Sequence, residues 1–383
     1  MSDSADVVVV GAGLHGCSAA LQLALRGQKT VVLERRHIGR HSSGINAGGV
    51  RTLGRDFAEV ELSVRGMRLW HGIRDLVGDD CGFAACGQIK VAESQEELAQ
   101  LEARAAESFA RGFTHERLIG RDELRRRVPA LAPHCVGGLT VDDDGAADPY
   151  RTAIAFARRA VARGVEIRED SAVLGLDRKG ERWRVDTSNG PVYAPVVVNA
   201  AGAWAAKVAA MAGDTVPLRT RASMMIVTER LPRFVDPVIG ATGRPLSFKQ
   251  TTAGTVLIGG GQQGRADLDT EQSFVEVQRL ARSALTAVEL FPVMSHVRMV
   301  RSWCGIEAET PDRLPVIGPS RKRQGLLHLF GFSGHGFQLG PICGVAIADL
   351  ITQGKTALPI RDLGIERFAS LPSLDPCALA GPL

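Results

Sequence analysis

The stretch DVVVVGAGLHGCSAALQLALRGQKTVVLE, residues 6–34, decides the fold of this chain. It begins with four valines, residues 7–10, which are typical of a parallel strand buried on both faces. The pattern GxGxxG follows at the point where a strand must turn into a helix. Small and aliphatic residues at helical spacing then predict a helix through residue 25, and a second strand is expected at residues 30–33. The stretch therefore predicts a βαβ unit that binds a dinucleotide.

Each polar or small position of this unit has a physical role in such a site. Gly11 permits a tight turn, Gly13 lets a pyrophosphate approach the backbone, and Gly16 lets the helix pack close to the strand. Glu34 stands at the end of the second strand, where a carboxylate can accept hydrogen bonds from ribose hydroxyls. The residues expected to contact the dinucleotide here are Gly11, Gly13, Leu14, His15, Gly16, Glu34 and Arg35.

Bulk properties exclude several classes of protein. A chain of 383 residues with 45% hydrophobic composition can bury a large core and suggests two domains. Its net charge of +4 comes from basic residues interspersed with acids, so no nucleic-acid footprint is visible, and no apolar run reaches the roughly 18 residues that span a bilayer. The N-terminus lacks the basic region of a secretory signal. Seven cysteines without a CxxC motif argue against a metal site or a disulfide framework and for a reducing cytoplasm.

A loop rich in Gly, Ser and Asn follows the first unit at residues 34–56. Such a loop keeps backbone N–H groups free and lets a flat ligand lie against it. The alternative is a plain surface loop. Arg51 and Arg55 stand near its end and are candidates for meeting an anionic substrate group. The loop residues expected at the cofactor are Ser42, Ser43, Asn46, Ala47, Gly48 and Gly49.

The middle of the chain alternates between two kinds of pattern. Buried apolar runs predict further strands beside the first unit, and alternating apolar and polar residues predict an antiparallel sheet. Strands are expected at residues 87–92, 137–140, 165–168, 172–176, 183–187, 196–200, 217–228, 246–250, 255–259, 297–305 and 326–330. Helices are expected at residues 57–77 and 271–290, and two charged helices within 94–127. Another helix is expected to follow the turn sequence DDDGAADPYRTA and to end at residue 163. Candidate cofactor contacts in this part, each also consistent with simple packing, are Val173, Ala201, Gly202 and Trp204.

The sequence GFSGHGFQLGP, residues 331–341, forms a second glycine-rich loop that runs into an apolar helix ending near residue 351. A glycine loop at a helix start brings free N–H groups and the positive end of the helix dipole together. The residues expected to face the cofactor from this loop are Gly334, His335, Gly336, Phe337 and Gln338.

Five motifs, taken in order along the chain, resemble the D-amino-acid-oxidase-like FAD oxidoreductases. They are the βαβ unit, NAGGVR, VVVNAAGAW, RSWCGIEAETPDRLPVIGP and GFSGHGFQLGP. Within this family the chain looks most similar to the group of sarcosine oxidase β subunits, proline and D-hydroxyproline dehydrogenases, opine oxidase subunits and glycine oxidases. The resemblance covers residues 6 to about 360 and implies that the dinucleotide is FAD.

The resemblance also implies an α/β architecture with two domains. One is a discontinuous, doubly wound FAD-binding domain of the glutathione-reductase type, expected at residues 1–85, 137–215 and 306–383. The other is an α+β substrate domain with a mixed, largely antiparallel sheet, expected at residues 86–136 and 216–305.

The chemistry that the family implies is two-electron oxidation of a carbon–nitrogen bond beside a carboxylate, with hydride transfer to flavin N5 and hydrolysis of the imine. Backbone N–H groups of residues 334–339 are expected to stabilise negative charge on the reduced flavin. His335 is expected to contribute mainly through its backbone, with a side-chain role as the alternative. The substrate is expected to be a small amino acid, and the leading class is a secondary amine such as D-hydroxyproline, proline, an opine or another N-substituted glycine.

Departures from the family pattern bear on the substrate. Gln338 stands where monomeric sarcosine oxidases carry a lysine that binds the substrate carboxylate, and Gly54 replaces a second arginine of that site. Glu307 stands where glycine and D-amino-acid oxidases carry an arginine. The carboxylate must then be held by Arg51 or by an arginine of the substrate domain, Arg221 or Arg301. Glu307 is expected either to bind an amine or second charged group of the substrate or to pair with a neighbouring arginine.

The electron acceptor is also open. The oxygen-activating lysine of monomeric sarcosine oxidases has no counterpart in residues 255–261, and Lys249 is on the preceding strand. This favours a dehydrogenase that passes electrons to a quinone, a dye or a partner subunit. Gly305 occupies the position of the family's flavin-linked cysteine, and Cys304 is expected to face the opposite side of its strand, so FAD is expected to be non-covalent.

Two other functions stay open at this point. Related flavoproteins oxidise C–OH bonds, so a 2-hydroxy-acid or polyol oxidoreductase is an alternative. The resemblance to β subunits also allows a flavin subunit that is active only within a hetero-oligomer, with residues 94–127 as a docking surface.

Overall fold

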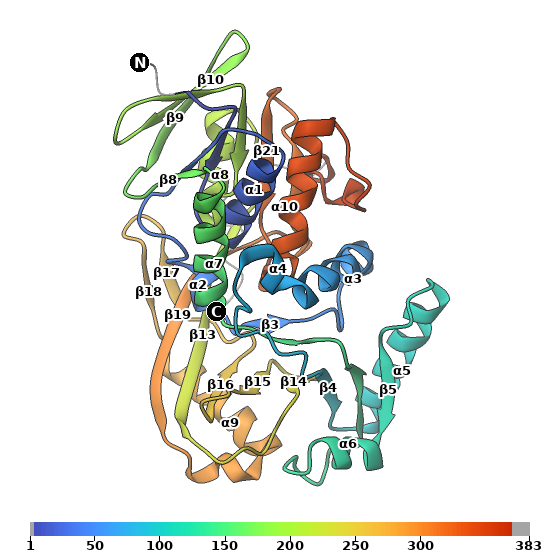
Figure 1. Cartoon of the computed structure of the whole chain (residues 1–383). Coiled ribbons are helices and arrows are strands. Elements are labelled where there is room, and N and C mark those ends of the chain that lie inside the picture. The colour runs from blue at the N-terminus through green and yellow to red at the C-terminus, as the bar shows by residue number, and fades with distance from the viewer. Residues whose placement is uncertain (1–3, 370–383) are drawn as a thin grey trace.

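The computed structural model describes residues 4–369, which form two main sheets, one in the upper and one in the lower half of Figure 1. The upper sheet has six strands, and all neighbours pair in parallel except the antiparallel edge strand β20. In spatial order its strands are β20 (Val316–Pro319), β21 (Leu326–Phe330), β12 (Val196–Asn199), β1 (Val7–Val10), β2 (Thr30–Leu33) and β8 (Glu166–Arg168).

The first strand, β1, is buried on both faces, as its four valines predict. Val7 and Val9 pack into the core beneath the helical layer, and Val8 and Val10 pack into a second core on the opposite face. The helical layer consists of α1 (Leu14–Leu25), α7 (Pro149–Ala162) and α10 (Gly336–Gln353). The opposite face is covered by α8 (Ala205–Met211) and by a three-stranded antiparallel sheet of β9 (Val173–Lys179), β10 (Arg182–Thr187) and β11 (Val192–Ala194). The predicted βαβ unit of residues 6–34 is thereby confirmed.

The lower sheet has eight strands and is mixed, with antiparallel pairs at every step except β14 and β4, which run parallel. In spatial order its strands are β19 (Met299–Glu309), β13 (Arg219–Arg230), β16 (Thr255–Gly259), β15 (Ser247–Gln250), β14 (Val238–Ala241), β4 (Gln88–Ala92), β6 (Gly137–Val141) and β5 (Arg117–Gly120). Helix α9 (Val277–Leu290) packs on one face, where Phe291 just beyond it stacks on Phe248 with ring centroids 4.2 Å apart. The other face is left for the site.

Shorter elements connect the two sheets and cover their edges. The helices are α2 (Ser42–Ile45), α3 (Phe57–His71), α4 (Ile73–Val77), α5 (Gln95–Ala110) and α6 (Arg121–Arg127). Two strand pairs are β3 (Gly49–Val50) with β7 (Gly145–Ala146), and β17 (Arg265–Asp267) with β18 (Gln272–Phe274). The 3-10 helices are η1 (Gly202–Trp204), η2 (Pro292–His296), η3 (Arg361–Leu363) and η4 (Ile365–Phe368). None of the helices in the described part of the chain is long and apolar enough to cross a membrane.

Several boundaries differ from those expected from the sequence. The block 94–127 contains the strand β5 between its two helices, because RLIG pairs with β6, and a four-residue apolar run cannot be distinguished from a helical turn by periodicity. The strand β6 pairs with β4 and β5, so residues 137–141 lie in the lower sheet and not with the FAD-binding segments as expected.

Two further differences lie at the end of the chain's middle part. Strand β19 extends to Glu309 and so passes the boundary expected between residues 305 and 306. The helix expected at 271–290 begins only at Val277, because residues 272–274 pair with β17 as a hairpin.

Candidate active site

A cavity of about 800 Å³ lies between the two sheets. Its lining includes the residues that follow the carboxyl ends of four strands of the upper sheet, namely Gly11, Glu34, Ala200 and Gly331. The cavity thus has the position where ligands bind in open α/β sheets, and its volume lies in the range of ligand sites. Residues of the lower sheet form the opposite wall, at alternate positions on β4 and β13.

Three glycines shape the turn at the start of α1. Gly11 has a φ of +107°, a conformation that favours glycine, and Gly11 and Gly13 line the cavity. A Cβ on Gly16 would lie 1.9 Å from the carbonyl oxygen of Gly11, so only glycine lets α1 pack this close to the end of β1. Gly16 itself does not line the cavity, and it acts by this packing.

Glu34 holds the glycine turn as well as facing the cavity. Its carboxylate accepts hydrogen bonds from the backbone N–H groups of Ala12, at 2.8 Å, and Arg36, at 2.9 Å. Burial raises the pKa of Glu34, and these two N–H groups oppose the shift by stabilising the charged form. The adjacent Arg35 lies over the Trp204 ring, 4.8 Å from its centroid, and pairs with Glu271.

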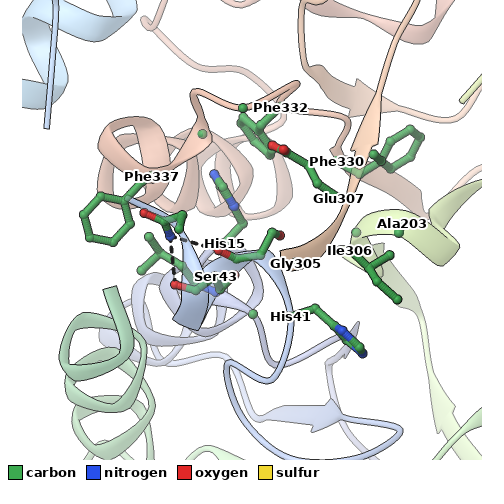
Figure 2. A pocket seen from close by; sticks show the side chains of 18 of the residues that line it. His15, His41, Ser43, Ala203, Gly305, Ile306, Glu307, Phe330, Phe332 and Phe337 are labelled. Carbon is green, nitrogen blue, oxygen red and sulfur yellow. Dashed lines mark hydrogen bonds between the residues drawn. The ribbon is translucent and has the colours of Figure 1, made fainter. Parts of the chain in front are cut away.

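The loop after β2 is folded back onto the start of α1. Ser43 accepts a hydrogen bond from the backbone N–H of Leu14 at 2.9 Å, and Figure 2 shows Ser43 turned toward this helix start. Asn46 bonds to the carbonyl oxygens of Ser42 and Ser43 and accepts from the N–H of Gly48, so its side chain closes the loop. The predicted loop residues all line the cavity: Ser42, Ser43, Asn46, Ala47, Gly48 and Gly49.

The second glycine loop meets the first at the start of α10. The rings of His15 and Phe332, both labelled in Figure 2, stack with centroids 3.6 Å apart, and a Cβ on Gly336 would lie 2.9 Å from Cε1 of His15. His15 is buried, which lowers its pKa to about 3, and its Nε2 atom has no hydrogen-bond partner among residues 4–369. A neutral imidazole with an orphaned nitrogen and two helix starts, α1 and α10, therefore face one cavity.

These features fit an extended dinucleotide with a charged pyrophosphate. The first-turn N–H groups of α1 and α10 are suited to anions, and the cavity wall near Val173, Ala201 and Gly202 offers small residues against which a flat ring can lie. No cysteine of the described range lines the cavity, and Cys304 is buried in the core on the other face of β19. Residues 4–369 therefore offer no thiol for covalent attachment.

Glu307 projects from β19 toward the second glycine loop (Figure 2). Ser223 donates a hydrogen bond to its carboxylate at 3.3 Å, and burial raises its pKa. Within the described residues Glu307 has no ion pair, because Arg221 opposite it pairs with Glu309 instead. Arg221 therefore acts on Glu307 as a nearby charge that lowers the pKa of the carboxyl and opposes the effect of burial, and no cation of the described residues lies within 4.0 Å of it.

Arg51 lies on the same cavity and also lacks a carboxylate partner. Its guanidinium donates to the carbonyl oxygen of Leu53 at 2.7 Å, and no carboxylate of residues 4–369 lies within 4.0 Å. Burial lowers its pKa from the ordinary value. The backbone beside Arg51 is held by the buried Asp144, which accepts hydrogen bonds from Thr52 and Leu53. Sequence reasoning did not single out Asp144, which stands in the acidic turn DDDGAAD.

Arg55 is buried, and its guanidinium donates hydrogen bonds within the protein. It donates to the carbonyl oxygens of Arg51 and His335 and to the side-chain oxygen of Gln338. The other expected carboxylate ligand, Arg301, does not line the cavity. Of the arginines expected to hold the carboxylate, Arg51 is therefore the one that lines the cavity without a carboxylate of the described residues within 4.0 Å.

The structure does not support a side-chain contact of Gln338 with cofactor or substrate. Gln338 is fully buried and absent from the cavity lining. Its side-chain oxygen accepts from the hydroxyl of Ser63 on α3 at 2.8 Å, and its side-chain nitrogen donates to the Ser63 backbone carbonyl at 2.9 Å. The backbone carbonyl of Gln338 accepts from the indole of Trp70. Successive helical residues point about 100° apart, so the side chain at 338 faces α3 while Gly336 faces the cavity.

His335 lines the cavity, and a residue that sequence reasoning missed lies behind it. Glu59 on α3 is fully buried, with its Oε2 atom 3.3 Å from Nδ1 of His335 and 3.9 Å from Arg55. Glu59 shares the buried face of α3 with Ser63, Gly66 and Trp70. A carboxylate on the apolar stripe of an amphipathic helix was the signal available in the sequence.

Comparisons with known proteins agree with this arrangement. The family model described as FAD dependent oxidoreductase, DAO, matches residues 6–350. Hydrogen cyanide synthase subunit HcnC of Pseudomonas aeruginosa is 27% identical over 97% of this chain and 98% of its own length. Sarcosine oxidase subunit beta of Rhodobacter capsulatus is 27% identical over 98% of this chain and 91% of its own.

Among solved structures, L-proline dehydrogenase from P. horikoshii superposes with a TM-score of 0.89 and 28% identity, covering 96% of this chain and 99% of that one. The expected fold, an FAD-binding domain with a mixed-sheet substrate domain, is confirmed by this likeness. The protein belongs to the DAO family of FAD dependent oxidoreductases, and FAD is its cofactor.

Proposed function

We propose that this protein oxidises the carbon–nitrogen bond of an amino acid, with secondary amines such as D-hydroxyproline, proline, opines or other N-substituted glycines as the leading class. One observation carries the proposal. A cation without a carboxylate partner, Arg51, and a carboxyl without a cation partner among the described residues, Glu307, line the same cavity. A zwitterionic amino acid complements both charges.

The two side chains have different roles in the proposal. Arg51 binds the substrate carboxylate and so orients the α-carbon. Glu307 receives the amine, and because burial raises its pKa, its carboxylate is suited to take a proton from the substrate ammonium. N–H groups at the start of α10 stabilise negative charge in the cofactor. FAD supplies the acceptor for the two electrons.

The reaction balances without a further protein group. The substrate ammonium loses a proton and the α-carbon loses a hydride equivalent, which leaves a protonated imine. Water then adds to the imine carbon and the C–N bond breaks, which gives a carbonyl group and an amine; these separate for an acyclic substrate and stay in one molecule for a ring such as proline. The names of the relatives support this class, because they include sarcosine oxidase subunit beta and L-proline dehydrogenase.

We favour a dehydrogenase over an oxidase. Strand β16 carries no lysine, and Lys249 on β15 does not line the cavity. Its ammonium instead donates to the carbonyl oxygen of Ala147 at 3.2 Å and lies behind Gly48. The acceptor in this proposal is a quinone, a dye or a partner subunit. Two relatives are named as subunits, which supports a hetero-oligomer.

Anaerobic bleaching of the flavin band tests the reaction class. N-methylalanine, alanine and lactate differ only in the group on the α-carbon, which is a methylamino, an amino or a hydroxyl group. They are compared together with both enantiomers of proline, hydroxyproline and an opine. The proposal expects bleaching by one or more amines and none by lactate. Bleaching by hydroxy acids alone would mean a C–OH oxidoreductase, and no bleaching by any amine would contradict the proposal for the isolated chain.

The acceptor is tested on the sample that an amine has reduced. Admitting air should restore the flavin band slowly, whereas a quinone analogue or a dye should restore it quickly. Rapid re-oxidation by air would show that the protein is an oxidase.

A further inference from the structure

The wall of the cavity formed by the lower sheet has a polar end at β4. Gln88 and Lys90 line the cavity, whereas Ile89 and Val91 between and beyond them are buried in the core under α9. This is the alternation of a strand that has one face on a core and one on a site. On the neighbouring strand β14, the cavity-lining residues Val238 and Gly240 offer no charged group. Strand β14 therefore offers no charged partner for the polar side chains of Gln88 and Lys90.

The ammonium of Lys90 has no ion-pair partner among the described residues. No carboxylate of residues 4–369 lies within 4.0 Å of its ammonium. Burial lowers the pKa of Lys90, and the positive charge of Arg51 lowers it further. Lys90 and Arg51 are half-buried cations that repel each other. Glu97 and Glu116 offset the charge of Lys90 only from beyond 4.0 Å, so an anion that approaches from the cavity would stabilise both cations.

Gln88 adds a second unsatisfied group beside Lys90. Its Oε1 atom is buried and has no hydrogen-bond partner in the described part of the chain. An amide offers one acceptor and two donors, and its rotation by 180° presents the donors instead. On one strand face, the ammonium of Lys90 and the amide of Gln88 together match a carboxylate.

Two other arginines that line the cavity have partners. Arg221 pairs with Glu309, and Arg55 donates to main-chain carbonyls and to Gln338. If Arg51 binds the α-carboxylate, Lys90 is a further positive charge that a monocarboxylic amino acid does not use.

We infer that the substrate carries a second anionic group, bound by Lys90 and Gln88, and that it is a dicarboxylic amine such as a glycine whose nitrogen bears a carboxyalkyl chain. The inference rests on the proposed function, because Arg51 is taken to hold the first carboxylate. It narrows the proposed class from secondary amines in general to those with two acids.

A binding experiment tests the subsite without requiring turnover. Calorimetric titration of the FAD-loaded protein compares glutarate with 5-amino-5-oxopentanoate, in which one carboxylate is replaced by an uncharged amide of the same shape. Glutarate should bind at least 10-fold more tightly, and Lys90→Met should remove most of this preference. Lys90→Arg should retain it. Lys179→Met, at an exposed lysine on β9, is the matched control and should leave the preference unchanged.

The outcomes separate this inference from the proposed function. Binding of glutarate and its half-amide is measured as above, and anaerobic bleaching compares N-(2-carboxyethyl)glycine with its terminal amide. If amines bleach the flavin but a second carboxylate changes neither binding nor bleaching, the inference is wrong and the proposed function stands. If glutarate is preferred through Lys90 but no amine bleaches the flavin, the subsite stands and the proposed function fails.

An equal loss of affinity for both ligands in Lys90→Met would also overturn the inference, because a single carboxylate would then use Arg51 and Lys90 together. Should Lys90→Met not fold, the wild-type preference and Lys90→Arg decide.

Discussion

The Nδ1 atom of His335 lies 3.3 Å from the Oε2 atom of Glu59, and Nε2 of the same ring lies 3.0 Å from the carbonyl oxygen of Arg313. A carbonyl only accepts, so Nε2 carries the hydrogen and the neutral ring turns the lone pair of Nδ1 toward Glu59. A carboxylate would be repelled at this distance, whereas a protonated carboxyl would not. Burial favours the same state, because it raises the pKa of Glu59 to about 7 and lowers that of His335. The pair lies where α3 meets the start of α10.

Glu59→Gln should change how stability depends on pH. The pKa of Glu59 in the folded protein, about 7, is above its unfolded value of ~4.3, so the folded state holds a proton that the unfolded state has released. The stability from this group is complete below about pH 4.3 and is lost as the pH rises through about 7. The amide introduced by the substitution does not titrate, so the Tm of the variant relative to wild type should rise between pH 5 and 8, by an amount that corresponds to at most about 3 kcal/mol at 1.36 kcal/mol per pKa unit.

Glu61→Gln is the matched control for this experiment, because Glu61 lies on the same helix and its side chain is 48% exposed. Its Tm difference should not vary over the same pH range. A constant difference for Glu59→Gln as well would mean that Glu59 is already ionised at pH 5.

Arg51→Ala should raise the amine concentration needed for half-maximal bleaching by 10-fold or more. A charge-assisted hydrogen bond contributes roughly 1.5–3 kcal/mol, and the guanidinium of Arg51 is the group expected to provide it. Arg74→Ala, at a side chain that is 73% exposed, serves as the control. An unchanged titration for Arg51→Ala would mean that another cation of the cavity binds the substrate carboxylate.

Gly16→Ala should reduce both bound FAD and the Tm. The added methyl group would lie 1.9 Å from the carbonyl oxygen of Gly11, so the start of α1 would have to move away from β1, a change that typically costs about 1–3 kcal/mol or more. FAD content is measured from the flavin absorbance of the purified protein. Gly120→Ala adds the same methyl group at a position with no atom within 4 Å and should retain full FAD content. Normal FAD loading of Gly16→Ala would contradict the tight packing at this turn.

Glu307→Gln should flatten the acidic limb of the pH profile of flavin bleaching. In the wild type the rate should increase with pH as Glu307 loses its proton, and burial displaces this limb to a higher pH than for an exposed glutamate. Ser223→Ala removes the hydrogen bond that stabilises the carboxylate, so it should move the limb to still higher pH without abolishing it. If Glu307→Gln keeps the wild-type limb, Glu307 is not the group that titrates.

Acid precipitation should release the flavin into the supernatant. Cys304 faces the core behind β19, and no other cysteine of residues 4–369 lines the cavity. Flavin that stays with the precipitated wild-type protein, and is lost in Cys304→Ser, would show a covalent bond and a different local arrangement of β19.

Local patterns in the sequence were sufficient for the nucleotide half of the site. The GxGxxG pattern was sufficient to predict the turn between β1 and α1, although in the fold Gly11 also lies against Ala200 and Gly13 against Ser43. The loop at 42–49 and the glycine loop before α10, also recognised by their composition, line the cavity. Each is a short segment that its own residues identify, although residues from elsewhere in the chain, such as Leu14 for Ser43, hold it in place.

Only the tertiary structure shows what the side chains that distinguish this protein contact. Gln338 and Gly336 are two residues apart, yet the packing of α10 on α3 turns one inward and leaves the other on the cavity. The alternation of β4 places Gln88 and Lys90 on one face, but only the sheet as a whole shows that this face is the site. The partners of Glu59 and Glu307 come from segments far away in the chain, and burial by those segments sets their pKa values, so neither could be read from the sequence.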